Sequence, residues 1–71
     1  MTRYMGILYD MQIFTLRAND TQELADKINA GFIDDKYNVS NVLEYFVIPD
    51  ICTDDYIQGR MDELYNRHWN K

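Results

Sequence analysis

Hydrophobic and polar residues alternate between residues 4 and 17. Apolar side chains take every second position from residue 5 to residue 13, which is the period of a β-strand with one buried face. We predict a strand over residues 11–17, which are rich in β-branched and aromatic side chains. A helical spacing also fits the first half of the segment. A separate strand, a continuation past a bend and a short helix therefore all remain open there.

A helix is predicted over residues 20–33. Asp20 stands at the N-cap position, and Glu23 follows three residues later in the spacing of a capping box. Glu23 and Lys27 are spaced to form an ion pair one turn apart. Gly31 is expected to terminate or fray the helix. Apolar residues recur every four positions along its inner face: Leu24, Ile28 and Phe32.

A second strand is predicted over residues 39–48. Residues 42–48 are almost all β-forming, and Pro49 ends the run. A run with so few polar residues indicates either a strand covered on both faces or an interior strand of a dimeric sheet. The alternative for this segment is a helix that begins at Ser40.

A second helix is predicted over residues 53–69. Thr53 is a suitable N-cap, with carboxylates in the first turn and cations in the last, as the helix dipole favours. Gly59 costs about 1 kcal/mol relative to alanine without abolishing the helix. Glu63 and Arg67 are spaced to pair. The inner face is predicted to carry Ile57, Met61, Leu64, Tyr65 and His68.

Together these elements predict an α+β fold. The expected arrangement is a small β(β)αβα domain, in which two or three strands pack against two amphipathic helices. A length of 71 residues allows a single domain, residues 1–71. So short a chain has a small core, and its one cysteine, Cys52, cannot form an internal disulfide. A homodimer is therefore one expected source of additional stability.

Charge and hydropathy restrict the partners. The formal net charge of −5 disfavours nucleic acid and anionic membrane surfaces, and it favours a basic protein partner. No apolar run approaches the roughly 18 residues that indicate a membrane-spanning helix. Asp10 interrupts the apolar N-terminal segment before it could form the core of a signal peptide. We therefore expect a cytoplasmic protein with no nucleic-acid partner and no membrane partner.

No residue pattern indicates an enzyme, a cofactor or a metal site, and we expect none of the three. Cys52 and His68 are the only residues of their kinds, and a helix over residues 53–68 separates them by about 22 Å. The acidic segment at residues 50–55 lacks both the alternating ligand spacing and the glycine of a calcium loop. The three glycines are isolated from one another, so the sequence contains no phosphate-binding loop.

Aromatic residues give the clearest indication of function. Six tyrosines and one tryptophan are more than a small core buries, and such side chains are enriched at protein interfaces. We therefore expect a protein-protein interaction module that docks through acidic and aromatic side chains. A composition rich in Ile, Asn, Asp and Tyr suggests an AT-rich coding sequence, and a phage or mobile-element protein that inhibits a host protein is one natural form of such a module. The expected partner-binding residues are Asp34, Asp35, Tyr56, Asp62, Tyr65 and Trp69.

Two alternative functions remain. The first is a structural homo-oligomer, in which residues 42–48 pair across a two-fold axis to complete a sheet. The second is a helix-turn-helix DNA-binding regulator, formed by residues 21–25 and 39–43. The connection over residues 30–38 is longer than the turn of that motif, and its second segment lacks Arg and Lys. The regulator is therefore the weaker alternative.

Overall fold

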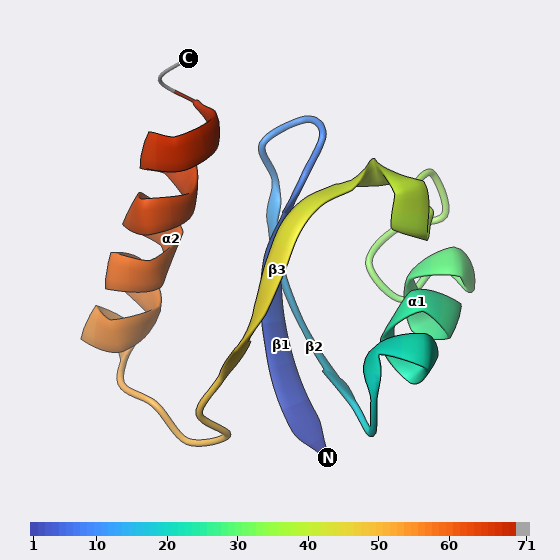
Figure 1. Ribbon diagram of the computed structural model, residues 1–71, viewed down its shortest axis with the longest axis horizontal. Coiled ribbons are helices and arrows are strands. Elements are labelled where there is room, and N and C mark those ends of the chain that lie inside the picture. The colour runs from blue at the N-terminus through green and yellow to red at the C-terminus, as the bar shows by residue number, and fades with distance from the viewer. Residues whose placement is uncertain (70–71) are drawn as a thin grey trace.

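The computed structural model describes residues 1–69 and has an α+β architecture. Three strands form one antiparallel sheet in the spatial order β2-β1-β3, and two helices pack against it (Figure 1). The predicted fold class is therefore confirmed. The elements in chain order are β1 (Thr2–Leu8), β2 (Ile13–Ala18), α1 (Thr21–Asn29), the 3₁₀ turn η1 (Val39–Asn41), β3 (Val42–Ile48) and α2 (Asp54–His68).

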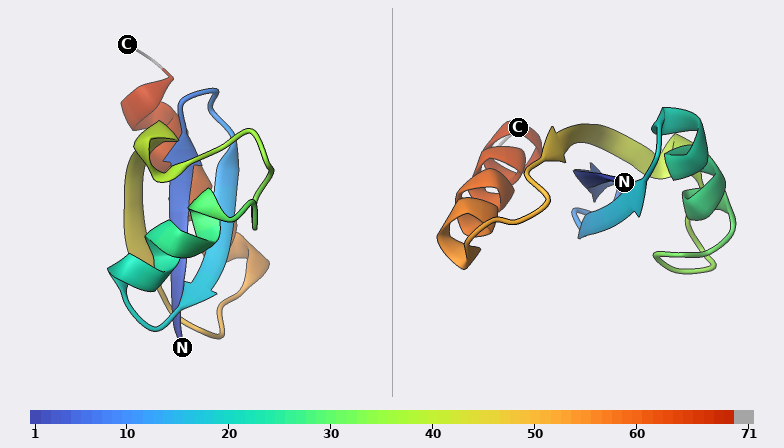
Figure 2. Two further views of the ribbon diagram at one scale, coloured as in Figure 1. Left: turned by 90° about the vertical axis from the view of Figure 1, so that its right-hand side faces the viewer. Right: turned by 90° about the horizontal axis from the view of Figure 1, so that it is seen from below.

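The two helices cover opposite faces of the sheet (Figure 2). Each helix buries its own apolar cluster, and the central strand β1 supplies alternate side chains to both clusters. A strand that is covered on both faces in this way needs apolar residues at nearly every position. The buried residues under α1 are Tyr4, Leu8, Phe14, Ala18, Leu24, Ile28 and Tyr37. The buried residues under α2 are Met5, Ile7, Ile48 and Leu64.

β1 and β2 form a hairpin, which decides how the first alternating segment folds. Their register pairs Ile7 with Ile13. The backbone N–H of Leu8 donates to the carbonyl of Gln12 across the turn (2.9 Å). Met11 adopts a left-handed backbone with a φ of 69°, as one residue does in a three-residue hairpin loop. The first half of the segment is therefore a separate strand, and neither a helix nor a continuation of the second.

α1 begins as predicted but ends earlier. The side chain of Asp20 accepts a hydrogen bond from the backbone N–H of Glu23 (2.8 Å). The helix stops at Asn29 because Gly31 takes a φ of 91°. The N–H groups of Gly31 and Phe32 then donate to carbonyls of the last turn (3.2 and 3.1 Å), as in a Schellman motif. Phe32 leaves the inner face and is 62% exposed, so its prediction as a core residue is wrong.

β3 is an edge strand that is covered on one face only. Phe46 and Ile48 pack under α2, whereas Tyr45 and Val47 are 47% and 59% exposed on the opposite face. The prediction of cover on both faces is therefore wrong within one chain, because α1 lies over β2 and leaves β3 open. The helical alternative from Ser40 reduces to the single turn η1. The strand also stands where a helix-turn-helix regulator needs its second helix.

α2 begins after Thr53, whose hydroxyl oxygen accepts a hydrogen bond from a backbone N–H of the first turn (3.2 Å). The predicted inner face is confirmed, since its side chains are buried or half-buried. The predicted pair between Glu63 and Arg67 does not form. Arg60 pairs with Glu63 (2.8 Å), and Arg67 pairs with Glu44 of β3 (2.6 Å). Arg67 thus pairs with a residue of another element, Glu44, and not with Glu63, which lies one turn before it on α2.

Candidate functional site

Two of the residues predicted to bind a partner lie in the loop after α1. Asp34 and Asp35 are both exposed there, and Asp34 accepts a hydrogen bond from the backbone N–H of Lys36 (3.1 Å). This loop lies on the α1 side of the sheet, opposite α2 (Figure 1). The pair is therefore separated from the other four predicted residues by the sheet itself.

The other four residues lie on or next to α2. Tyr56 stands in the first turn, and the exposed Asp62 accepts a hydrogen bond from the side-chain amide of Gln58 (3.0 Å). Tyr65 and Trp69 meet at the opposite end of the helix, edge to face, with ring centroids 6.3 Å apart. The structure thus brings these two aromatic residues together and places Tyr56 about 14 Å from Tyr65 along the helix axis.

Tyr65 and Trp69 form one wall of an open hollow of about 480 Å³. The other wall is the turn between β1 and β2, with Asp10, Met11 and Gln12. Trp69 is 64% exposed, which is unusual for the largest apolar side chain. The amino-acid sequence does not indicate that this turn belongs to the site, because only the packing of α2 on the sheet brings the end of the helix to the hairpin. We refer to these five residues as the hairpin hollow.

The carboxylate of the hairpin hollow is held in its ionised form. The hydroxyl of the buried Tyr37 donates to Asp10 (2.5 Å), and the ammonium group of Lys36 lies 3.7 Å from the same carboxylate. The hydrogen bond from Tyr37, followed by weaker contributions that include Lys36, lowers the pKa of Asp10 below its usual value. The same hydrogen bond raises the pKa of Tyr37. Asp10 is therefore an ionised carboxylate at the wall of the hollow, with Lys36 and Tyr37 as its partners.

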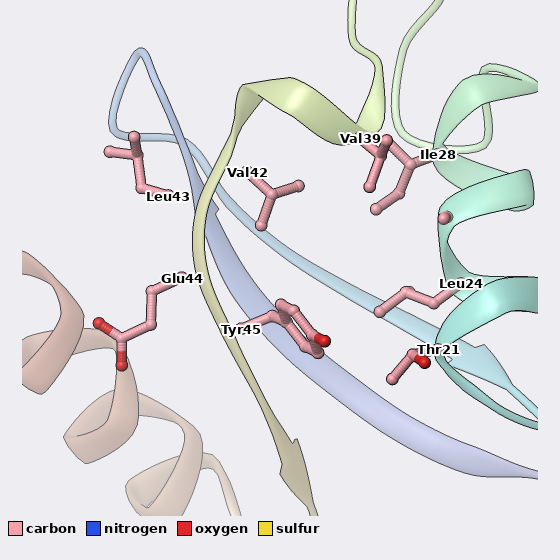
Figure 3. Close-up of a pocket in the computed structure, with 9 residues that line it drawn as sticks. Thr21, Leu24, Ile28, Val39, Val42, Leu43, Glu44 and Tyr45 are labelled. Carbon is pink, nitrogen blue, oxygen red and sulfur yellow. The ribbon is translucent and has the colours of Figure 1, made fainter.

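A second candidate surface lies along β3. An apolar groove of about 360 Å³ runs between this strand and α1, with Leu24 and Ile28 on one side and Val42 and Tyr45 on the other (Figure 3). Leu43 points away from the groove, because a bulge opposite Ile7 and Leu8 shifts the alternation of side chains. We refer to Tyr45 and Val47, together with the outer edge of their strand, as the β3 surface.

The outer edge of β3 has no neighbouring strand within residues 1–69. Figure 1 looks onto this edge, with β3 in front of β1 and β2 and with one helix on each side. The one charged residue of the strand, Glu44, is already engaged. Arg67 donates to it through two nitrogens (2.9 and 2.6 Å), and His68 lies 2.8 Å from it. These hydrogen bonds, led by those of Arg67, lower the pKa of Glu44.

The opposite edge of the sheet is protected in a way that β3 is not. Arg17 of β2 pairs with Asp50, and the ammonium group of Lys27 donates to the backbone carbonyl of Arg17 (2.6 Å). Lys27 also lies 3.4 Å from Glu23, as the sequence predicted. Charged side chains on an edge strand discourage pairing with another chain. Both edge strands thus carry a charge that is paired within the chain, and they differ in that Lys27 covers one backbone carbonyl of β2.

The groups that could serve in catalysis lie apart. The guanidinium of Arg3 lies 3.6 Å from the sulfur of Cys52 before α2, whereas His68 pairs with Glu44 at the other end of that helix. Within residues 1–69, no group of three or more His, Cys, Asp or Glu side chains is placed to hold a metal ion. Among the helices described, none has the length and apolar character needed to cross a membrane.

Relationships to known proteins do not assign the site. Comparison with protein-family models, with curated protein sequences and with solved structures found no match for this chain. A function must therefore be argued from the β3 surface and the hairpin hollow themselves.

Proposed function

We propose that this chain is a protein-interaction module that binds a polypeptide strand along β3. The observation that carries the proposal is an edge strand of seven residues, Val42–Ile48, whose outward face exposes Tyr45 and Val47 and whose one charge is neutralised within the chain. Long apolar edge strands without protective charges are sites of pairing with another chain.

The energetics of sheet extension favour this use of the strand. A partner strand would satisfy the outward backbone N–H and C=O groups of β3 with regular hydrogen bonds. Each favourable cross-strand pair adds roughly 0.2 to 1 kcal/mol. The exposed rings and branched side chains of the β3 surface supply such pairs. An isolated strand of this composition is otherwise prone to aggregation, so a physiological partner is the simpler explanation of its exposure.

The proposal is tested by site-specific photo-crosslinking. A benzoyl-phenylalanine replaces Val47 on the β3 surface in one variant, and it replaces Thr15 on the protected strand β2 in the matched control. We expect residue 47 to crosslink to a strand segment of a polypeptide, either this chain or another, in lysate of the source organism. Residue 15 should give no such product. Equal crosslinking from both positions, or none from residue 47, would refute the proposal.

A second candidate function rests on the hairpin hollow. Two aromatic rings beside an ionised carboxylate form a favourable site for a cationic side chain, and the net charge of −5 attracts basic partners. Asp10, Tyr65 and Trp69 would then bind a lysine or arginine of a partner protein. Such docking retains the acidic and aromatic interaction expected from the sequence, including the form in which a phage protein inhibits a host protein.

Titration with a lysine-rich peptide tests this second function, because Trp69 is the only tryptophan and reports on the hollow. We expect a saturable change in its fluorescence at low salt and a much weaker one at high salt. Asp10→Asn should weaken binding, whereas Asp26→Asn, which removes an exposed carboxylate of α1 on the other side of the sheet, should not. A fluorescence titration that changes neither with salt nor with Asp10→Asn would exclude the hollow as the binding site.

A further inference from the structure

We propose that a hollow beside β2 binds a small oxyanion of the phosphate type. The hollow has a volume of about 300 Å³, and three cations line it: Arg3 of β1, Arg17 of β2 and Lys27 of α1. The other lining residues are Thr15 and Leu16 of β2, so none of the lining residues that the structure describes is acidic. We refer to these five residues as the basic hollow. The site is independent of the proposed function, because β2 and β3 form opposite edges of the sheet.

Two of the three cations lie opposite each other on neighbouring strands. The register of β1 and β2 pairs Arg3 directly with Arg17. Both side chains therefore lie on one face of the sheet, together with Thr15, two residues before Arg17. Like charges directly opposite each other destabilise an antiparallel pair. An anion between the two guanidinium groups would replace this repulsion by two favourable contacts, because guanidinium binds phosphate through parallel N–H donors.

Arg3 is left without a counter-ion. Within residues 1–69, every other lysine and arginine forms an ion pair with a carboxylate, and Arg3 does not. Its guanidinium donates to the sulfur of Cys52 (3.6 Å), which is a weak acceptor. Acidic residues are not scarce, since the chain contains 12 of them. A free arginine in so acidic a chain is what a site for an external anion requires.

The charge around the basic hollow favours a small anion over a polyanion. Asp50 pairs with Arg17, and Glu23 lies 3.4 Å from the ammonium group of Lys27. Neither carboxylate lines the hollow. Three cations and two carboxylates leave one positive charge in excess, that of Arg3. The net charge of −5 repels nucleic acid at long range, whereas a small anion at the site is screened from charges more than about 8 Å away.

Hydrogen-bond donors suited to a phosphate are available in the basic hollow. A guanidinium carries five N–H donors and an ammonium three, and Lys27 uses one of them on the backbone carbonyl of Arg17 (2.6 Å). The exposed Thr15 adds a hydroxyl. Phosphate oxygens accept such charge-assisted hydrogen bonds. Leu16 offers an apolar contact to a carbon group attached to the phosphate.

Titration of the full-length chain with inorganic phosphate, followed by two-dimensional amide NMR, tests the site. Chloride at the same ionic strength is the reference anion. We expect saturable shifts of the backbone amides of Thr15 and Arg17 with phosphate only. Arg3→Gln should raise the dissociation constant about tenfold or more, whereas Arg60→Gln, which removes the same charge from α2, should leave it unchanged. Shifts that do not saturate, or that are equal in Arg3→Gln and the wild type, would overturn the proposal.

Thermal unfolding separates a ligand site from a structural role of Arg3. Without phosphate, Arg3→Gln should be at least as stable as the wild type, because it removes the repulsion between Arg3 and Arg17. Phosphate should raise the unfolding temperature of the wild type and of Arg60→Gln but not of Arg3→Gln. If Arg3→Gln is less stable than the wild type by the same amount with and without phosphate, Arg3 is structural and the proposal fails.

Replacing inorganic phosphate by glycerol phosphate in the same titration identifies the source of the anion. Tighter binding of the ester assigns the basic hollow to a phosphorylated small molecule whose carbon group contacts Leu16. Equal or weaker binding assigns it to free phosphate. Both results require the saturable, Arg3-dependent shifts described above, and failure of both anions would overturn the proposal.

Discussion

Gly6 and Gly59 allow one substitution, glycine to alanine, to be made in two environments with opposite expected effects. Gly6 lies in β1, opposite Phe14 of β2 and Tyr45 of β3. A Cβ atom there would lie 2.6 Å from the backbone carbonyl oxygen of Glu44 and 2.6 Å from the ring of Phe14. Real Cβ atoms do not approach other heavy atoms so closely, and the carbonyl belongs to the strand ladder. β3 would therefore have to shift.

The magnitude follows from the packing. Overpacking of a well-filled core costs about 1 to 3 kcal/mol, and a domain of this length is stable by roughly 4 to 11 kcal/mol in total. Gly6→Ala therefore removes a substantial share of the stability. Gly59 lies inside α2, and a Cβ there meets no atom within 4 Å. Gly59→Ala should instead stabilise the protein by about 1 kcal/mol, because alanine favours the helix.

Urea unfolding followed by circular dichroism measures both effects at one protein concentration. With a slope of about 1 kcal/mol per molar urea, the midpoint should fall by roughly 1 to 3 M for Gly6→Ala and rise by about 1 M for Gly59→Ala. An unchanged slope shows that the change lies in the free energy of unfolding. A Gly6→Ala midpoint equal to that of the wild type would refute the close approach of β1, β2 and β3 at this position.

Substitutions at three further positions test the two ends of α1 and the ion pair between Glu44 of β3 and Arg67 of α2. Gly31→Ala should cost about 1 to 2 kcal/mol, because its φ of 91° disfavours any side chain; an unchanged urea midpoint would contradict its role in ending α1. Asp20→Ala removes the acceptor for the N–H of Glu23 and should cost about 1 kcal/mol, while Asp20→Asn, which keeps an acceptor, should cost much less. Arg67 lowers the pKa of Glu44 in the folded state, so the ionised carboxylate stabilises the folded protein at pH values above the pKa of Glu44 in the unfolded chain. This stabilisation is lost as the pH falls through the pKa of Glu44 in the folded protein. The stability difference between the wild type and Glu44→Gln should therefore shrink from neutral pH toward about pH 3, and a constant difference would contradict the pairing.

Local interactions explain what could be predicted from the sequence alone. The beginnings of both helices follow from Asp20 and Thr53, which cap the nearest backbone N–H groups. The inner face of α2 follows from its helical period, and the strand character of residues 42–48 follows from their composition. Each of these features depends on residues within one or two turns of each other. The amino-acid order therefore determines them before any tertiary contact forms.

Tertiary structure decided which side chains meet and which edge stays open. Glu44 pairs with Arg67 and His68 and not with a residue near it in the sequence, because α2 packs across β3. Asp10 and Trp69 line one hollow because the packing of α2 on the sheet brings the end of the helix to the hairpin. The apolar run 42–48 was compatible with a buried strand and with an edge strand, since composition does not specify a neighbour. Only the position of α1 over β2 exposed the β3 surface, and that position depends on contacts between segments far apart in the chain.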